Sequence, residues 1–334
     1  MRHGQNGGYG VLMSATTLRI DRQARAQSGA TIREAMGIAL LRLAYWASTP
    51  IGHLGISRVS RLVGGMFLTR GETAFVLNPQ TTFLTPSGDY YWSLLYNYGY
   101  EYEPELELVF HAFRDLDYAL IDLGANYGYW SILVSSPEFG NKAVVAVEAS
   151  VTSFGLLEEN VAQRSALIAA HHGAIWNVSG EELSFFGTRH AGRSLVKGWA
   201  GSEQVERVHT ITVADLVSRY ADRIGNHRLV LKLDVEGVEI AALEGAAAVL
   251  DRIDAIIFEE VNNQRYGETF LKLRELTGFE IFAFDEQKRT FGTIESPFTL
   301  FDPKKGMLPL QNFGFNFVAV RPSSPFASAV KTAR

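Results

Sequence analysis

The sequence predicts an α/β fold: a seven-stranded, mostly parallel sheet with helices on both faces, preceded by an amino-terminal helical extension. From Tyr118 onward, apolar runs of five to seven residues alternate with helical segments, which is typical of a parallel sheet covered on both faces. Seven runs are expected as strands: Tyr118–Leu123, Ala143–Glu148, Leu167–Gly173, Leu229–Asp234, Ala255–Glu259, Phe279–Phe284 and Phe315–Val320. A hairpin of Glu181–Gly187 and Arg207–Ile211 interrupts the alternation, and a helix is expected at 213–221.

Changes in composition divide the chain into four regions. Residues 1–30 are polar and rich in glycine, so we expect a flexible tail there, followed by a helical or cap region at 31–99. In that region the apolar pattern indicates a helix at 35–47 and a second, basic helix near 57–63, separated by a break at Pro50. The α/β domain is expected at 100–322, with a short tail at 323–334.

Charge and composition exclude some classes of binding partner and some types of site. The 334 residues carry a formal net charge of -5, which offers no basic field for a phosphate backbone, so we expect no nucleic-acid partner. The chain contains no cysteine, which excludes disulfides and thiolate metal sites and is compatible with a cytoplasmic location. The apolar segment at 35–47 is shorter than the roughly 20 residues that span a bilayer, so we expect no transmembrane span.

The turn after the first predicted strand carries the clearest chemical signal. The segment Asp122-Leu123-Gly124-Ala125-Asn126-Tyr127-Gly128 runs from a buried strand directly into a helix. Ligands bind at the carboxyl ends of strands in such sheets, and glycines let the backbone approach them closely. The spacing is not the G-x-G-x-x-G of dinucleotide sites, and the carboxylate of Asp122 would repel phosphate but attract an ammonium group. This favours S-adenosylmethionine over a nicotinamide dinucleotide; an ordinary turn without a ligand is the alternative.

Two further acidic features lie where the second and fourth predicted strands end. Glu148 follows the glycine loop by about twenty residues, the position from which a carboxylate accepts both ribose hydroxyls of an adenosine. The segment 231–239, Leu-Lys-Leu-Asp-Val-Glu-Gly-Val-Glu, places three acids around Gly237. Strand alternation points Lys232 and Asp234 the same way, and a buried lysine needs a carboxylate partner.

In combination these motifs resemble the FkbM family of methyltransferases. The resemblance rests on Asp122–Gly128, Glu148, Lys232–Glu239, Leu243–Ala246 and the strand ending at Glu259, and also on Tyr102–Glu105, Asn160, Gly192–Ser194, Thr212–Leu216 and Asn316–Val320. It covers about residues 100–321. It implies a class I, Rossmann-like methyltransferase fold that uses S-adenosylmethionine, usually to O-methylate sugars or secondary metabolites. Val213-Ala214 departs from the Leu-Asp usual in the family, so no role is assigned to the helix that follows.

The candidate site residues divide into two groups. For binding S-adenosylmethionine we expect Asp122, Gly124, Asn126, Tyr127, Gly128, Glu148 and Asp234. For catalysis we expect Asp234, Glu236 or Glu259 to act as general base toward a hydroxyl group. No metal ligand is assigned, although Asp234, Glu259, Glu260 and Asn262 offer the oxygen atoms that Mg²⁺ would require.

The expected partner is a small-molecule or carbohydrate acceptor. A nicotinamide-dependent oxidoreductase and a non-catalytic adenosine-binding module are the alternative functions. For the amino-terminal helices we favour packing against the catalytic domain or a second subunit in a homo-oligomer. Peripheral contact with a membrane is the alternative, because Arg33, Arg42, Arg58 and Arg61 lie beside large apolar residues.

Overall fold

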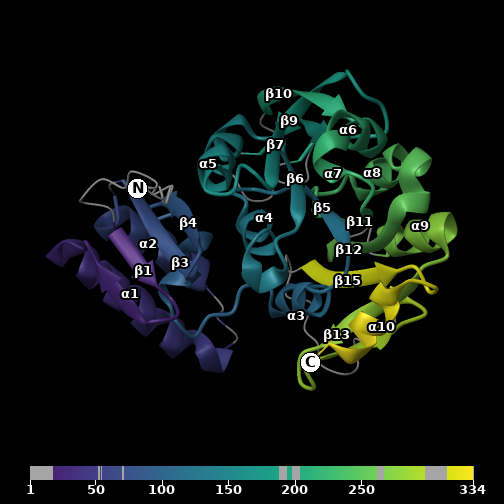
Figure 1. The fold of residues 1–334 in the computed structure, drawn as a ribbon. Coiled ribbons are helices and arrows are strands. Elements are labelled where there is room, and N and C mark those ends of the chain that lie inside the picture. Colours follow the sequence, from purple (N-terminus) through teal and green to yellow (C-terminus); the bar gives the residue numbers. More distant parts are fainter. Residues whose placement is uncertain are drawn as a thin grey trace, which may run out of the picture. The chain divides into compact units, whose positions relative to one another are not determined.

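The computed structural model describes residues 18–51, 53, 55–69, 71–187, 194–197, 204–261, 267–297 and 314–333. The chain divides into two compact units, Met1–Tyr102 and Glu103–Arg334, which Figure 1 draws in purple to blue and in blue to yellow. The division falls a few residues after the boundary expected at 99/100.

The first unit consists of a small sheet and a pair of helices. Its elements are β1 (Leu18–Asp21), β2 (Ala26–Ser28), α1 (Ile32–Ser48), the 3-10 turn η1 (Thr49–Ile51), α2 (Ile56–Phe67), β3 (Glu72–Asn78), β4 (Thr81–Pro86) and η2 (Trp92–Tyr96). The strands lie in the order β2-β1-β3-β4. Leu18–Asp21 was expected within the flexible tail at 1–30, but it pairs in parallel with β3 and buries Leu18 and Ile20.

An eight-stranded sheet forms the centre of the second unit. Its strands are β5 (Tyr118–Leu123), β6 (Ala143–Glu148), β7 (Ile168–His172), β11 (Arg228–Leu233), β12 (Ile253–Val261), β13 (Glu280–Asp285), β14 (Thr290–Thr293) and β15 (Gly314–Val320). The order across the sheet is β14-β13-β15-β12-β11-β5-β6-β7. The strands from β12 to β7 run parallel, whereas β15 pairs antiparallel with both β12 and β13. The predicted α/β fold is therefore confirmed.

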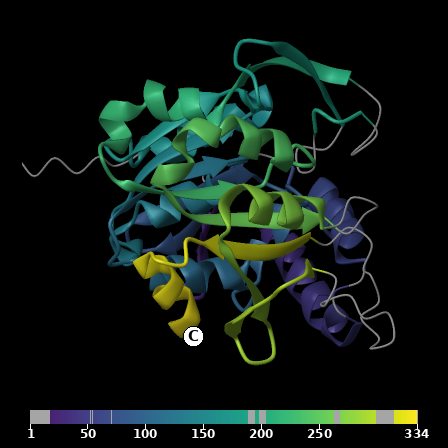
Figure 2. The same ribbon diagram turned by 90° about the vertical axis from the view of Figure 1, so that its right-hand side faces the viewer.

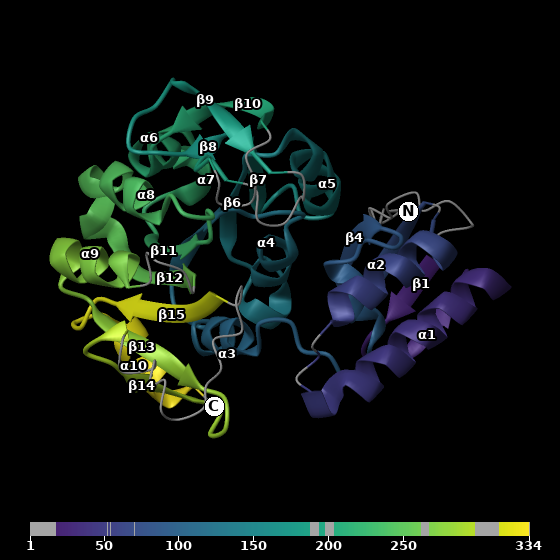
Figure 3. The ribbon, with the colours of Figure 1, turned by 180° about the vertical axis from the view of Figure 1, so that it is seen from behind.

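Helices cover both faces of this sheet. Figures 1 and 3 show α3, α4 and α5 on one side and α6, α7, α8 and α9 on the other. Their bounds are α3 (Pro104–Ala112), α4 (Tyr129–Val134), α5 (Val151–Ala162), α6 (Val213–Arg219), α7 (Ala221–Ile224), α8 (Glu239–Gly245) and α9 (Glu268–Thr277), with the 3-10 turns η3 (Pro137–Phe139) and η4 (Ala247–Arg252).

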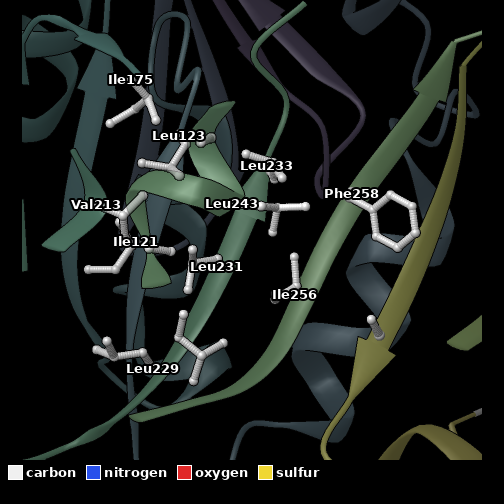
Figure 4. Packing of buried hydrophobic residues seen from close by; sticks show 14 of the residues in the cluster. Ile121, Leu123, Ile175, Val213, Leu229, Leu231, Leu233, Leu243, Ile256 and Phe258 are labelled. Carbon is white, nitrogen blue, oxygen red and sulfur yellow. The ribbon is translucent and has the colours of Figure 1, made fainter. Parts of the chain in front are cut away.

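The two faces of the sheet differ in chemistry because neighbouring side chains on a strand point to opposite sides. Ile121 and Leu123 of β5 pack with Leu231 of β11 and with helix residues such as Val213 and Leu243 in one buried apolar cluster (Figure 4). The alternate positions on the same strands include Asp122 of β5 and Lys232 of β11, both buried. This second face, covered by α3 and α4, is where the polar residues of the site lie.

A short insertion lies between β7 and α6. It contains β8 (Ala174–Ile175), β9 (Glu182–Phe186) and β10 (Gln204–Ile211), arranged in the order β8-β10-β9. The antiparallel pair of β9 and β10 is the hairpin that the sequence predicts, and Figure 2 shows it in teal at one edge of the unit.

Two details of the second unit differ from the predictions. The sheet has an eighth strand, β14, which pairs antiparallel with β13 at the edge. The tail expected at 323–334 forms helix α10 (Pro325–Thr332). Its residue Phe326 packs edge-on against Phe113 and Tyr118, so burial of this apolar side chain accounts for the helix.

Candidate active site

The candidate site lies at the edge of the sheet where β5, β6, β11 and β12 end. From β5 the chain continues to β6 and β7 on one side, while β11 and β12 lie on the other side of β5. The order of the strands therefore reverses between β5 and β11. In open α/β sheets a ligand binds in the crevice at such a reversal.

The glycine loop after β5 is held by backbone hydrogen bonds. The amides of Gly124 and Ala125 donate to the carbonyl oxygen of Val147 at the end of β6, at 3.0 and 2.9 Å. Gly124, Asn126 and Gly128 have φ angles of 80°, 51° and 87°, in the left-handed region that glycine adopts readily and asparagine tolerates. The loop is thus a fixed turn between strand and helix.

The two glycines of this loop are required by packing within the protein. A Cβ atom on Gly124 would overlap the carbonyl oxygen of Asp234, and one on Gly128 would lie 2.7 Å from Leu157 of α5. From the sequence, both glycines are expected to let the backbone approach the ligand closely. Within the described residues they also let the loop approach Asp234, which follows β11, and Leu157 of α5.

Asn126 and Tyr127 occupy the middle of the loop. The side-chain oxygen of Asn126 accepts a hydrogen bond from the amide of Tyr127 at 2.8 Å. The carbonyl oxygen of Tyr127, whose side chain is buried, accepts from the side-chain amide of Asn160 at 2.9 Å. Asn160, noted in the sequence only as part of the resemblance, therefore anchors the loop from α5.

Glu148 joins the end of β6 to the glycine loop. Its two carboxylate oxygens accept from the backbone amides of Asn126 (2.9 Å) and Ser150 (2.8 Å). Burial raises the pKa of Glu148 to about 7 although both hydrogen bonds act in the opposite direction. A carboxylate has about four acceptor positions, so Glu148 retains acceptors for the hydroxyl groups of a ligand.

Asp122 lies beneath the loop on the polar face of β5. It is 1% exposed, and its Oδ2 accepts from the hydroxyl of Ser131 of α4 at 2.6 Å. Its Oδ1 is buried and has no hydrogen-bond partner among the described residues. Burial raises the pKa of Asp122, while Lys232 and Ser131 oppose this shift. One buried acceptor of this carboxyl thus stays available beside the loop.

Lys232 supplies the positive charge of the site. It lies on β11 directly beside Asp122 of β5 in the sheet register, and its Nζ is 2.9 Å from Oδ2 of Asp234. Burial alone would lower the pKa of Lys232, but Asp234, Asp122 and Glu103 together raise it above the ordinary value. Lys232 is therefore charged, and it fixes the carboxylate of Asp234, whose side chain is 29% exposed.

Glu103 was noted only within the resemblance, and the structure gives it a place in this cluster. It precedes the first residue of α3, and its carboxylate accepts from the indole Nε1 of Trp130 at 2.5 Å. Burial raises the pKa of Glu103 to about 7, Lys232 lowers it, and Asp234 raises it. The contact joins α3 to α4, a juxtaposition that no local pattern in the sequence indicates.

Glu259 lies on β12 and belongs to the same cluster. Burial raises its pKa well above the ordinary value, and the nearby charges of Asp234, Glu236 and Glu103 raise it further. Among the described residues no hydrogen bond to its carboxyl group is present. The protonated form of its carboxyl group is therefore favoured more than in an exposed glutamate.

Glu236 lies in the turn between β11 and α8. Its φ angle is 54°, and its carbonyl oxygen accepts from the hydroxyl of Ser194 in the insertion at 2.5 Å. The next residue, Gly237, donates its amide to the side chain of Glu239 at 2.9 Å, so Glu239 holds the turn.

The structure brings Asp122, Asp234 and Glu259 together around Lys232.

The residues considered as oxygen ligands for Mg²⁺ are not all directed toward the same site. Glu260 is 2% exposed, and its carboxylate accepts from the backbone amides of Gly267 (3.0 Å) and Phe270 (2.6 Å) at the start of α9. Asn262 lies outside the described residues. In the part of the chain that the structure describes, no group of three or more His, Asp or Glu side chains is arranged to hold a metal ion.

Strand order and site together define a class I methyltransferase fold: a mostly parallel sheet in which β15 and the edge strand β14 are reversed, with a glycine loop after β5. The family model described as the methyltransferase FkbM domain matches residues 122–288, which is half of the chain. The chain belongs to the FkbM methyltransferase family and is a methyltransferase, as the sequence motifs predicted.

Solved structures of other proteins are similar to this chain at low sequence identity. The precorrin-6y C5,15-methyltransferase from Geobacter metallireducens GS-15 is 10% identical, with 66% of this chain and 88% of that chain covered and a TM-score of 0.34. The methyltransferase FkbM from Methylobacillus flagellatus KT is 16% identical, with 60% and 52% covered and a TM-score of 0.36. No curated protein is significantly similar in sequence.

Proposed function

We propose that the protein O-methylates a hydroxyl group of a sugar, polysaccharide or hydroxylated metabolite, with S-adenosylmethionine as the methyl donor. The observation that carries the proposal is the carboxylate of Asp234, held by the buried ammonium of Lys232 and partly exposed at the end of β11. A hydroxyl group is a weak nucleophile at neutral pH, and a positioned carboxylate can accept its proton.

The residues at the edge of the sheet fit the donor. When bound, S-adenosylmethionine supplies a methyl group activated by a sulfonium. Asp122 retains a buried oxygen without a partner among the described residues, suited to a donor's ammonium. Glu148 retains acceptor positions for ribose hydroxyls. We assign these two acids, the loop residues Gly124, Asn126, Tyr127 and Gly128, and Asp234 to donor binding.

We propose different catalytic roles for the acids of the cluster. Asp234 is held by the ammonium of Lys232 and is partly exposed at the end of β11, so we assign it the role of general base. Burial and acidic neighbours raise the pKa of Glu259, which favours its protonated form, so we assign it hydrogen-bond donation to the acceptor. Glu236 follows in the same turn and is the second candidate for the base.

The acceptor is proposed to be neutral and polar. Carboxyl groups outnumber the single ammonium of Lys232 in the cluster, and the chain carries a net charge of -5, which disfavours a nucleic-acid acceptor. The absence of cysteine is compatible with the reducing cytoplasm, where we propose that the protein acts. The family match favours methyl transfer over the nicotinamide-dependent alternative.

Transfer of a labelled methyl group to a panel of acceptors tests the proposal. We expect labelled product with sugars or hydroxylated metabolites, and none with the matching O-methylated compounds, in which the reacting oxygen is blocked. Transfer only to amines would contradict O-methylation, and transfer only to RNA would contradict the proposed class of acceptor. Donor binding by calorimetry without turnover of any acceptor would favour the non-catalytic alternative.

A further inference from the structure

Helix α1 of the first unit is apolar on two opposite sides. One side, with Gly37, Ile38 and Leu41, is buried in the unit. The other side carries large apolar side chains that are 41–84% exposed: Ile32, Met36, Leu40, Leu43 and Trp46. A helix that is apolar all round is expected to be covered on all sides. The exposed side of α1 is therefore a candidate interaction surface.

Helix α2 continues this surface. Its residues Val59, Leu62 and Met66 recur at intervals of three and four and are 39%, 64% and 51% exposed, so they form one stripe along the helix. The two helices are in contact, because Nε of Arg33 donates to the carbonyl oxygen of Met66 at 2.9 Å. The eight exposed apolar residues of α1 and α2 are called the apolar surface below.

The two helices carry arginines without acidic partners. Arg33, Arg42, Arg58 and Arg61 lie on them, and among the described residues none of the four forms an ion pair. Arg42 is half-buried and donates to the carbonyl oxygen of Tyr96, so the exposed charges are those of Arg33, Arg58 and Arg61. The one acid on these helices, Glu34, is occupied in capping α1, where it accepts from the amide of Thr31 at 2.8 Å. Residues 1–102 hold nine arginines and five acids, whereas the whole chain has a net charge of -5.

We propose that the apolar surface binds an anionic lipid bilayer, with α1 and α2 lying in the interface. Apolar side chains would enter the acyl boundary, and the arginines would meet phosphate groups that supply the missing negative charges. Trp46, 74% exposed, has the amphipathic ring that is enriched at this depth. No helix in the described part of the chain is long and apolar enough to cross a membrane, which agrees with interfacial binding.

A second copy of the chain fits the surface less well. A symmetric dimer places the same patch on both sides of its interface, so unpaired arginines would face arginines. An anionic lipid surface complements both the apolar and the charged part of the patch. The two occupants predict different behaviour in solution, which the following experiment separates.

Co-sedimentation of the full chain with vesicles tests this inference. We expect binding to vesicles of phosphatidylglycerol and phosphatidylcholine, little binding to phosphatidylcholine alone, and weakening by salt. Arg58→Glu should weaken binding about fivefold or more, since each arginine near an anionic surface contributes about 1 kcal/mol. Leu43→Asp should weaken vesicle binding about tenfold or more, because it places a charge within the apolar surface.

Quenching by brominated lipid tests the depth of Trp46. Vesicles with brominated lipid should quench the tryptophan fluorescence of the wild type more than that of Trp46→Phe.

Matched variants on the second unit serve as controls. Leu271→Asp changes another leucine that is 54% exposed, and Arg114→Glu reverses another exposed charge. Both should bind vesicles like the wild type, and circular dichroism should show all variants folded. The inference is overturned if the wild type does not bind anionic vesicles, or if the controls weaken binding equally. It also fails if the wild type is a dimer that Leu43→Asp dissociates and vesicles do not bind.

Discussion

A single buried ammonium sets the electrostatics of the candidate active site. Lys232 forms an ion pair with Asp234 and acts on the carboxyl groups of Asp122 and Glu103. The uncharged form of a carboxyl group is favoured by burial, and the charged form by a nearby ammonium. Lys232 thus opposes the effect of burial on the pKa of Asp122 and Glu103, whereas the acidic neighbours of Glu259 raise the pKa of that group further.

Asp234→Asn tests the assignment of the general base. We expect kcat to fall roughly a hundredfold or more, because the lost interaction acts chiefly in the transition state. The donor Kd should change far less, since Asp122, Glu148 and the glycine loop still hold the donor. The comparison is Glu236→Gln, two residues further along the same turn. A larger loss of kcat in Glu236→Gln would move the role of base to Glu236. Wild-type kcat and KM in both variants would mean that the acids are structural.

Glu148→Gln tests the proposed contact to the ribose. The variant replaces a carboxylate by an amide and should weaken donor binding by about 1–3 kcal/mol, the range for a lost charged hydrogen bond. Calorimetry with the donor and with a deoxyribose analogue measures this. The analogue should bind the variant about as well as the full donor does. Glu158→Gln, an exposed change on α5, should leave both affinities unchanged, and additive losses would contradict direct contact.

At the residue scale, the sequence predicts the site residues that lie on the strands and in the turns after them. It does not predict the site residues contributed by the helices that cover the sheet. Asp122 and Lys232 come from buried strands whose alternation fixes the side on which they lie. Glu103, Trp130 and Ser131 meet them only because α3 and α4 cover that face. Such contacts depend on tertiary packing, for which no local spacing in the sequence is a signal.

At the scale of elements, the loop between β5 and α4 brings three segments of the sheet together. Gly124→Ala should lower the free energy of unfolding by more than about 1 kcal/mol and also weaken donor binding. The added Cβ overlaps the carbonyl of Asp234, and alanine disfavours a φ of 80°. Thermal denaturation and donor titration measure both effects.

Gly155→Ala is the matched control for this prediction. Gly155 lies in α5, no described atom would meet its added Cβ within 4 Å, and its backbone is not in the left-handed region. Alanine there should stabilise the protein by about 0.4–1 kcal/mol, since it restricts the unfolded chain without strain. If Gly124→Ala is equally stabilising, the close approach of loop and β11 is not required for the fold.

The elements that the sequence predicts well are those buried on both faces. β5 and β6 coincide with their predicted ranges, because each is a continuous apolar run bounded by polar residues. β14 was missed because it is a four-residue edge strand of TFGT, with little apolar pattern. α10 was missed because its eight residues, which begin at Pro325, show no clear helical pattern. The helix is stabilised by the packing of Phe326 against Phe113, which is distant in sequence.

At the scale of the whole molecule, raised carboxyl pKa values couple folding to pH. The pKa of Glu103 is raised to about 7 in the folded chain, from an ordinary value of 4.5. The folded state then binds more protons than the unfolded state between these values, so this contribution to stability is present below about pH 4.5 and lost as pH rises to about 7. Thermal melts should therefore show wild type losing stability relative to Glu103→Gln over this window, and Glu158→Gln should not change the profile.

Binding of the donor should release protons for the same reason. S-adenosylmethionine carries a sulfonium and an ammonium, and positive charge near Glu148 and Glu103 lowers their pKa from about 7. At pH 7 each of the two carboxyl groups is protonated in a fraction of the molecules, so binding of the cation releases protons. At pH 8.5 nearly all molecules have both groups ionised, so almost no protons are released. Calorimetric titration in two buffers of different ionisation enthalpy measures the number released. Heats that differ between buffers at pH 7 and converge at pH 8.5 are expected; equal heats at pH 7 would place the bound cation away from these acids.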